Sequence, residues 1–475
     1  MNNAGMTNQE CIDKLIANGR KALAELATFD QEKIDELCRA CCDEFRQYGE
    51  ELAKEAVAET GLGNVESKIA KNCGTPVGVW WALKGKKSIG IIKRDEEKGL
   101  TYIAHPKGII SCVIPTTNPN MTILVNGVYA LKGGNVIICA PHPRAKKSTV
   151  HTVDILNGIL KKHGAPDNIF QCVEEPSMEL TQMMMAASDT VLGTGGTSMV
   201  KAAYSSGKPA YGVGPGNSHA IFDPDYDDIP GAVAKTIGSN CFDNGLVCAC
   251  PRAFVTPKAI SDTVVAELKK NHVFYVDDEE TRAKFRNLLF PEGFGKIGGD
   301  AVGKPVQEVA KLAGVSIPED TSIIVIKVHK YGREEPLCRE KMTPVAIHIE
   351  CDTLQDALEI VRQDLLVEGV GHSSIIHSNN RSFIEEAALR LPVSRIMVNT
   401  IGQGCANAML DNSLVPTSTL GCGSWAGCSI SENLTYMHLI NISRIAYRLP
   451  PEKVPTEEEV FFSDKTSNLD DLAGI

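Results

Sequence analysis

Apolar and polar positions follow two repeating patterns along the chain, one typical of helices and one of strands. From about residue 7 to 60, apolar residues recur at spacings of three and four, as at Ile12 and Leu15, and this predicts helices. Two strand-like runs follow at 88–94 and 100–105, and a charged turn separates them. We interpret the pair as a β-hairpin arm that contacts another subunit.

Beyond residue 108, short strand-like and helical runs alternate. The strand-like runs lie at 109–114, 135–140, 169–173 and 190–192, and the helical runs between them lie at 121–131, 148–163 and 177–187. Such alternation is typical of a parallel sheet covered by helices. A second alternation starts near residue 235, with helical runs at 228–239, 260–270 and 354–362 and strand-like runs at 253–255, 322–328, 344–350 and 373–376. The pattern therefore predicts two α/β domains.

Length and charge narrow the classes of protein. A chain of 475 residues exceeds the size at which one hydrophobic core stops growing, so two large domains are expected. The formal net charge of -11 argues against non-specific nucleic-acid binding. No run of 18 or more apolar residues occurs, which argues against a membrane span. The polar first twenty residues lack the apolar core of a signal peptide, so we expect a cytoplasmic protein.

The sixteen cysteines are scattered singly, and many lie in apolar stretches, as Cys112 and Cys139 do. In such places cysteine acts as a small hydrophobic residue. One C-x-x-C pair, Cys38 and Cys41, lies in a helical stretch with no second pair or histidine to complete a tetrahedral metal site. We therefore expect free thiols in a reducing compartment and no metal site.

Three short motifs are candidates for chemistry. The Gly-rich turn from Gly193 to Gly196 follows a strand and would let backbone approach a pyrophosphate, although an ordinary turn is the alternative. The turn at Asn244 and Gly245 could hold Cys248 exposed as a nucleophile; the alternative is one more buried thiol. Asn118, in a loop bounded by two prolines, could donate its amide to an oxyanion or belong to a routine turn.

Together, in this order and at these separations, the motifs resemble the aldehyde dehydrogenase superfamily, and more narrowly its coenzyme A (CoA)-acylating branch. The resemblance covers about residues 8–450. The matching segments are 115–119, 202–207, 212–217, 242–245 before Cys248, 340–345 and 421–425. The closest likeness is to the short CoA-dependent succinate semialdehyde type, and it includes 429–434 and Arg444.

The resemblance implies an α/β fold of the aldehyde dehydrogenase kind, with two Rossmann-like domains and an oligomerisation hairpin. A nucleotide-binding domain would occupy residues 1–235 and include the hairpin at about 87–106. The catalytic cysteine domain would occupy 236–430, and segment 431–475 would return to the first domain and the oligomer interface. The active site would lie between the domains, and the arms would build a homodimer or a dimer of dimers.

The resemblance also implies a mechanism. Cys248 would attack the aldehyde, and the Asn118 side chain with the Cys248 backbone N–H would stabilise the oxyanion of the thiohemiacetal. Hydride transfer to the nicotinamide would leave an acyl-cysteine thioester, and CoA would take the acyl group reversibly. His372 would act as acid or base, or help to receive CoA; a structural histidine is the alternative.

The inference that CoA accepts the acyl group depends on the absence of a residue that could activate water. Hydrolytic members of the superfamily carry a glutamate before a Gly-Gly pair, where it activates water. The matching stretch here starts with Val213, which cannot accept a proton. A thiol with a pKa of about 8.5 needs less activation than water does. The acyl-enzyme would therefore persist until CoA arrives.

For the cofactor, NAD or NADP, the resemblance implies a set of contacts at Thr116, Pro141, His142, Gly193, Thr194, Gly195, Gly196, Gly214 and Glu340. No acidic residue in the loop at Pro141 would reject a 2′-phosphate, and Arg144, Lys146 and Lys147 lie nearby. These basic residues fit a solvated helix start equally well. The choice between NAD and NADP stays open on the sequence.

The chain departs from the branch just after the cysteine. Where members commonly show Ser-Glu-Gln, this chain has Cys250-Pro251-Arg252. Arg252 could bind an anionic end of the substrate or form an ion pair between the domains, and Arg395 is a second candidate. We expect a short aldehyde, either one with an anionic end, such as succinate semialdehyde or sulfoacetaldehyde, or acetaldehyde.

Two alternatives belong to other classes. One is an acyl-phosphate reductase of the same fold, which would need no CoA. The other is an inactive scaffold protein of bacterial microcompartments. The stretch from Phe242 to Cys248 and the segment 421–425 favour the acylating branch, and the joint presence of Cys248, Asn118 and Glu340 argues against an inactive protein.

Overall fold

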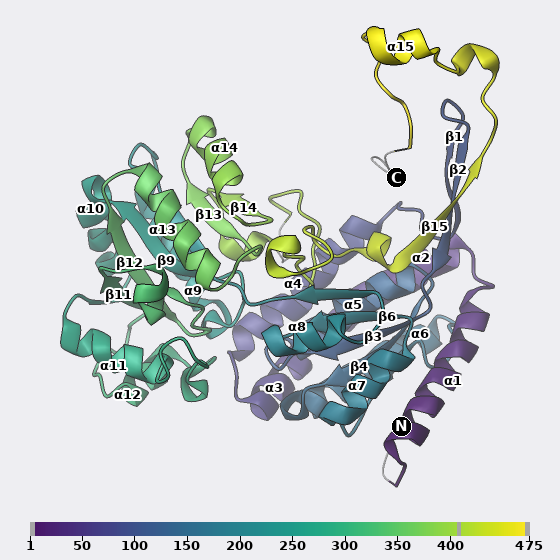
Figure 1. Ribbon diagram of the computed structural model, residues 1–475. Coiled ribbons are helices and arrows are strands. Elements are labelled where there is room, and N and C mark those ends of the chain that lie inside the picture. Colours follow the sequence, from purple (N-terminus) through teal and green to yellow (C-terminus); the bar gives the residue numbers. More distant parts are fainter. Residues whose placement is uncertain (1–4, 406–409, 471–475) are drawn as a thin grey trace.

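The computed structural model describes residues 5–405 and 410–470 and has two α/β lobes with an arm that projects from one of them (Figure 1). The chain starts with four helices, α1 (Asn8–Leu26), α2 (Gln31–Phe45), α3 (Gly49–Thr60) and α4 (Val65–Leu83). Side chains of Thr7, Asp30 and Asn64 cap the amino ends of α1, α2 and α4, which fixes where these helices begin.

The first lobe is built on a five-stranded parallel sheet in the order β5-β4-β3-β6-β7. The strands are β3 (Ile109–Ile114), β4 (Val136–Pro141), β5 (Phe170–Cys172), β6 (Thr190–Thr194) and β7 (Ala210–Val213). The helices between them are α5 (Pro119–Lys132), α6 (Lys146–Lys162), α7 (Met178–Ala187) and α8 (Thr197–Tyr204). Strand order reverses on either side of β3, so a crevice is expected at the carboxyl ends of β3 and β6.

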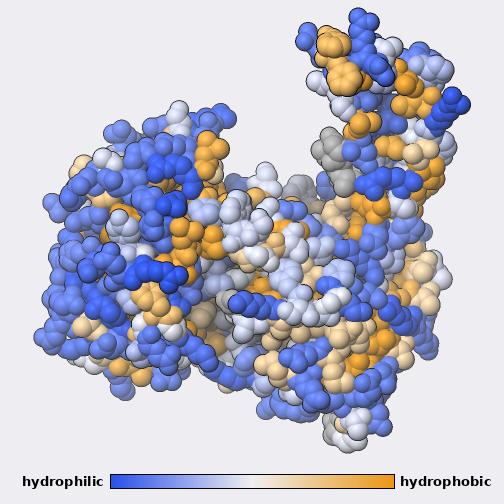
Figure 2. All heavy atoms as spheres, viewed as in Figure 1, coloured by the Kyte–Doolittle hydropathy of each residue, from blue (hydrophilic) through white to orange (hydrophobic). Residues whose placement is uncertain are grey.

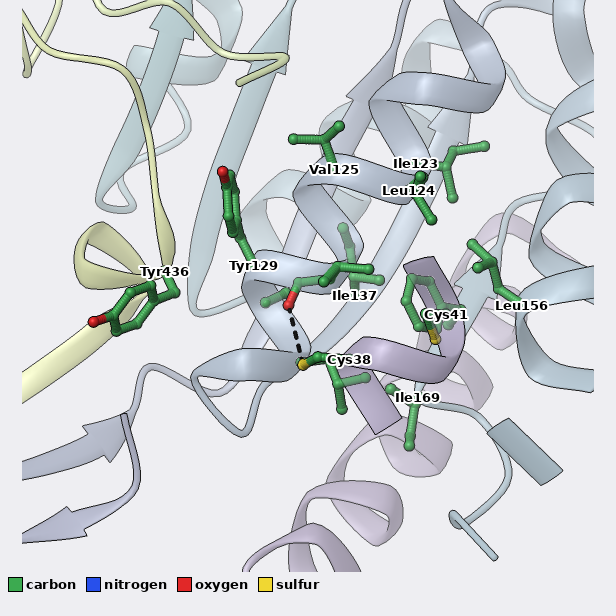
Figure 3. Close-up of a cluster of buried hydrophobic side chains, with 14 of the residues drawn as sticks. Cys38, Cys41, Ile123, Leu124, Val125, Tyr129, Ile137, Leu156, Ile169 and Tyr436 are labelled. Carbon is green, nitrogen blue, oxygen red and sulfur yellow. Dashed lines mark hydrogen bonds between the residues drawn. The ribbon is translucent and has the colours of Figure 1, made fainter. Parts of the chain in front are cut away.

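The core of this lobe joins distant parts of the chain. Figure 3 shows Cys38 and Cys41 of α2 packed among apolar side chains of α5 and β4, with Tyr436 from the C-terminal segment nearby. The Cys38 thiol lies 3.8 Å from the carbonyl oxygen of Val128. All sixteen cysteines are free thiols, as expected, and this pair fills the core as hydrophobic residues do. No helix among the described residues is long and apolar enough to cross a membrane.

The second lobe holds a seven-stranded parallel sheet in the order β10-β11-β12-β9-β8-β13-β14. Its strands are β8 (Ser218–Phe222), β9 (Pro251–Pro257), β10 (Phe274–Val276), β11 (Ile324–Val328), β12 (Val345–Cys351), β13 (Ser374–His377) and β14 (Ile396–Val398). Its helices are α9 (Ile229–Cys241), α10 (Lys258–Lys270), α11 (Glu279–Leu289), α12 (Val306–Leu312), α13 (Leu354–Val367) and α14 (Arg381–Arg390).

The chain crosses between the two sheets earlier than the expected boundary at 235/236. Strand β8 already pairs with β9 and β13, so the crossing segment is 214–217. The sequence pattern did not predict β8, because its first two residues, Ser218 and His219, are polar. His219 is buried, and its Nε2 lies 2.9 Å from Asp364, which satisfies the polar ring inside the sheet.

The expected hairpin arm is confirmed and gains a third strand. β1 (Gly90–Asp95) pairs antiparallel with β2 (Leu100–Pro106), and β15 (Ile440–Ala446) pairs along the other edge of β2. The C-terminal segment thus returns to the first lobe, and a short helix, α15 (Glu457–Phe462), lies beyond the arm (Figure 1). The α/β fold with two Rossmann-like domains and an arm is as the sequence predicts.

Candidate active site

A cavity of about 1060 Å³ lies between the lobes, where the carboxyl ends of β3, β4, β6 and β7 face loops of the second lobe. Ten of the residues predicted to form the site line it: Thr116, Asn118, Pro141, His142, Thr194, Gly195, Gly196, Gly214, Cys248 and Glu340. The five-stranded sheet contributes most of them because loops after neighbouring parallel strands meet at one edge. Cys248 and Glu340 complete the cavity from the opposite side.

Cys248 is partly exposed and follows a tight turn. Asp243, Asn244 and Gly245 all have left-handed backbone angles, with φ of 51°, 55° and 70°. A side chain at Gly216 could not be accommodated, because its Cβ would lie 2.0 Å from the Cys248 carbonyl oxygen. Burial raises the pKa of the Cys248 thiol well above its ordinary value, and Glu340 adds to the rise, while the Arg252 guanidinium opposes it.

Asn118 is the N-cap residue of α5, but its side chain does not cap that helix. Instead, its Oδ1 accepts a hydrogen bond from the Lys71 ammonium of α4. The carbonyl half of the amide is therefore occupied, and the amide nitrogen is the half left to face the cavity. This is the orientation that an oxyanion donor requires.

The glycine turn after β6 fits a pyrophosphate. Gly196 is the N-cap of α8 and provides no side-chain cap, so backbone N–H groups at this helix start are available to an anion. A Cβ at Gly196 or Gly214 would meet no atom within 4 Å, which leaves room for a ligand, and the buried Thr194 hydroxyl has no partner. Gly193 is different, because a Cβ there would lie 2.8 Å from the Ala203 side chain. Gly193 packs against α8 and is not among the residues that line the cavity, so its predicted contact with the cofactor stays a prediction.

Glu340 lines the cavity with 8% of its surface exposed. Burial raises its pKa to about 8, and the Arg252 guanidinium, whose Nη2 lies 3.7 Å from Glu340 Oε1, limits the rise. Val213, where a hydrolytic relative would carry its base, is an apolar residue of the cavity wall. The carboxylates among the lining residues are Glu340 and Glu368. Glu368 is already bonded to Arg339 and to the Glu340 backbone N–H.

Three predicted residues lie behind the cavity wall. Arg252 is fully buried, donates from Nη2 to the Val247 carbonyl at 3.0 Å, and leaves Nε and Nη1 without a partner. Arg395 is 5% exposed, and its donors bind Asn433 and three carbonyl oxygens, those of His372, Gly421 and Ser431. Neither residue is among those that line the cavity, although Arg252 contacts the lining residues Glu340 and Val247, so binding of a substrate anion by Arg252 and Arg395 stays a prediction.

His372 is also fully buried and outside the cavity lining. Its Nδ1 lies 2.8 Å from the Ser373 hydroxyl, and its Nε2 has no partner. Burial lowers its pKa to about 3, helped by Arg395 and Arg252, so the ring is neutral at pH 7. Its role as acid or base, or in receiving CoA, stays a prediction, with a structural histidine as the alternative.

The sequence reasoning missed two lysines of α4. Lys68 and Lys71 are both buried, and both bond to Asp243 in the turn at 243–245 before Cys248, called the nucleophile turn below. Their partner is more than 170 positions away in the chain, so no local pattern pairs them. The sequence feature that could have indicated them is their spacing of three, which puts both lysines on one helix face. Such a pair is ordinarily interpreted as part of a solvated surface.

The comparisons with known proteins agree with this geometry. The model of the aldehyde dehydrogenase family matches residues 2–281. Succinate-semialdehyde dehydrogenase (acetylating) of Clostridium kluyveri is 46% identical over 457 residues, which cover 96% of this chain and all of that protein. Sulfoacetaldehyde dehydrogenase (acylating) of Bilophila wadsworthia is 38% identical over 91% of this chain and 94% of its own length. An acetylating aldehyde dehydrogenase of Geobacillus thermoglucosidasius superposes with a TM-score of 0.89 at 34% identity, over 95% of this chain and 98% of that one. The chain therefore belongs to the aldehyde dehydrogenase family, in its acylating branch.

Proposed function

We propose that the protein interconverts a short aldehyde with an anionic end and its acyl-CoA, with Cys248 as the nucleophile. The observation that carries this proposal is the meeting of Cys248, Asn118 and Glu340 in one cavity whose wall has Val213 in place of a water-activating base. The acylating relatives support this over an acyl-phosphate reductase. The joint presence of the three groups supports it over an inactive scaffold.

In the proposed mechanism each residue has one task. The Cys248 thiolate adds to the aldehyde carbon, and the Asn118 amide donates to the oxyanion that forms. After oxidation the acyl group remains on Cys248 as a thioester. The apolar Val213 leaves water unactivated, so the thiol of CoA is the acceptor, and thioester replaces thioester in a reversible exchange.

A nicotinamide nucleotide, when bound, supplies the hydride acceptor. Thr194, Gly195, Gly196 and Gly214 would hold its phosphates, and Glu340 its nicotinamide ribose. NAD is favoured over NADP because the Glu59 carboxylate accepts the Lys147 and Ser148 backbone N–H groups at the start of α6. A 2′-phosphate beside this carboxylate would be repelled. Two of the three nearby cations are engaged as well, Arg144 with the Thr60 carbonyl and Lys146 with Glu175.

The charges of the cavity support an anionic substrate. Among the lining residues, Lys71, Arg144, Lys296 and Arg339 are cations, against the carboxylates Glu340 and Glu368. A cleft with an excess of one charge raises the local concentration of ligands of the other sign. CoA and the nucleotide also benefit from this excess. The named substrates of the relatives, succinate semialdehyde and sulfoacetaldehyde, both have anionic ends and direct the choice of test compounds.

The arm supports a homodimer. Figure 2 shows hydrophobic side chains along the arm, whereas the face of the second lobe in the same view is largely hydrophilic. Ile91 and Ile445 of β1 and β15 are 43% and 44% exposed, and Tyr447 beyond β15 is 58% exposed. Exposed apolar residues on strand edges are typical of surfaces covered in an assembly.

The proposal is tested by a matrix of reactions. Purified protein receives succinate semialdehyde, sulfoacetaldehyde, acetaldehyde or butyraldehyde, with NAD or NADP, with or without CoA, and reduced nucleotide is followed by absorbance. We expect the highest kcat/KM with an anionic aldehyde, NAD and CoA, and no turnover by Cys248→Ala. A preference for the uncharged aldehydes would contradict the substrate class, and equal use of NADP would contradict the role of Glu59.

A further inference from the structure

Two buried lysines and one buried carboxylate connect the loop at 115–118 between β3 and α5, called the oxyanion loop here, to the nucleophile turn. Lys68 and Lys71 lie three residues apart on α4 and share one face of that helix. Their side chains are 3% and 6% exposed, and the Asp243 side chain is fully buried. Buried ammonium groups are costly unless paired, and here both are paired with the Asp243 carboxylate.

The contacts of the cluster bridge two loops. Lys71 Nζ donates to Asn118 Oδ1 and, at 2.5 Å, to Asp243 Oδ2. Lys68 Nζ donates to the Thr117 carbonyl at 3.0 Å and to the same Asp243 oxygen at 3.1 Å. One carboxylate thus holds two ammonium groups, and each ammonium holds one residue of the oxyanion loop.

The chemistry of the Lys71 contact fixes the Asn118 amide. An ammonium group only donates hydrogen bonds, so the atom facing it must be the amide oxygen. The amide nitrogen is then turned away from Lys71. A neutral or absent side chain at position 71 would leave both orientations of the amide open. The cluster also carries two positive charges against one negative, and this excess lies beside the place where an oxyanion would form.

Asp243 is built into the turn that leads to Cys248. Its backbone is left-handed, an unfavourable conformation for a residue with a side chain. Its N–H donates to the Ser67 hydroxyl at 2.9 Å, and its Oδ1 accepts the Asn64 N–H at 3.0 Å, so α4 holds both ends of the residue. Burial alone would raise the pKa of Asp243, but Lys71 and Lys68 outweigh it and hold the pKa below its ordinary value. The turn is therefore tied to α4 by a charged carboxylate.

We propose that Lys71 is a positioning residue for the reaction, which orients the Asn118 amide toward the oxyanion while Asp243 and Lys68 hold it in place. The inference rests on the proposed function of the cavity. It extends that function to a helix outside both sheets, and it assigns to the cluster a role in the chemical step rather than in binding of the nucleotide.

The test is a double-mutant cycle of Lys71→Met, Asn118→Ala and the pair, with CoA-dependent kcat and the KM for nucleotide measured for each. We expect Lys71→Met to lower kcat roughly 10- to 100-fold, somewhat less than loss of an oxyanion donor does. The KM for nucleotide should change by less than about twofold, because the removed interaction acts on the chemical step. With Asn118→Ala already present, Lys71→Met should have little further effect, since no amide is left to orient.

Lys132→Met is the matched control. Lys132 is a buried lysine at the other end of α5, paired with Asp35, and it lies outside the cavity lining. Its loss should lower the thermal midpoint and leave kcat within about twofold, which separates a stability effect from a positioning effect. If Lys71→Met does not fold, Lys71→Gln replaces it in the same cycle, because its neutral amide can both donate and accept and so leaves both orientations of Asn118 open. Equal loss of kcat from the position-71 change with and without Asn118 would overturn the proposal. Absence of CoA-dependent turnover in the wild type would instead contradict the proposed function.

Discussion

At the scale of single residues, the protonation of Cys248 is set by opposing neighbours. Burial and the Glu340 carboxylate raise the pKa of the thiol, and the buried Arg252 guanidinium lowers it. The sequence singled out Arg252 as a departure from the family pattern. It did not indicate whether the side chain lies at the cavity surface or is buried behind it. A position four residues after the nucleophile fits the cavity wall and the layer behind it equally well, and the structure has Arg252 in that layer.

Arg252→Met should slow the reaction of Cys248 with iodoacetamide at pH 8 several-fold, because loss of the guanidinium raises the pKa of the thiol further and leaves less thiolate. Arg252→Lys keeps a positive charge and should retain most of the rate. The measurement is alkylation of Cys248 followed by peptide mass spectrometry across pH. An unchanged rate in Arg252→Met would show that the guanidinium does not act on the thiol.

At the scale of elements, the sequence predicted the helices and strands with regular patterns and missed those with interrupted ones. The strand predicted at 109–114 agrees with β3 at both ends. Helix α4 was not predicted, because Gly74 and Pro76 interrupt its apolar pattern and proline usually ends a helix. In the structure the helix continues through Pro76. This helix supplies Lys68 and Lys71, so the missed element is also the source of the missed site residues.

The short crossing between the sheets gives a prediction at this scale. A Cβ at Gly216 would lie 2.0 Å from the Cys248 carbonyl oxygen and 2.7 Å from its carbonyl carbon, so backbone must move in Gly216→Ala. We expect a loss of roughly 1–3 kcal/mol in the free energy of unfolding and a fall in kcat of more than tenfold. Gly158→Ala in α6 is the control, because its Cβ meets nothing within 4 Å, and it should stabilise the protein slightly. Wild-type kcat in Gly216→Ala would contradict this close approach. Urea denaturation and steady-state kinetics check both variants.

At the scale of the whole molecule, the alternating pattern predicted both lobes and the arm, since parallel sheets covered by helices repeat strongly along the chain. What the pattern could not give is the set of polar side chains inside the sheets. His348, His372 and His377 are buried, and burial lowers their pKa values to about 4, 3 and 4. Partners of two of them come from distant parts of the chain, Thr256 and Tyr275 for His348 and Thr236 for His377.

These histidines predict loss of stability in mild acid. In the unfolded chain they take up protons near pH 6.5, whereas the folded protein keeps them neutral down to about pH 4. Protons therefore favour the unfolded state as pH falls from 7 toward 4, at a cost of roughly 2 kcal/mol per histidine at pH 5. The urea midpoint should fall steeply between pH 7 and 5, and less steeply in His348→Asn. A midpoint that stays constant over this range would mean that the rings already bind protons in the folded state.

The central claim, that the acyl group leaves Cys248 for CoA and not for water, is tested most directly by a rapid-mixing experiment without CoA. Enzyme, NAD and succinate semialdehyde are mixed, and reduced nucleotide is measured against the concentration of Cys248. Val213 lies in the cavity wall where a base would activate water. We therefore expect at most about one nucleotide to be reduced per subunit before the reaction stops. Steady turnover should begin once CoA is added. Steady turnover before CoA is added, at a rate close to that with CoA, would contradict the account.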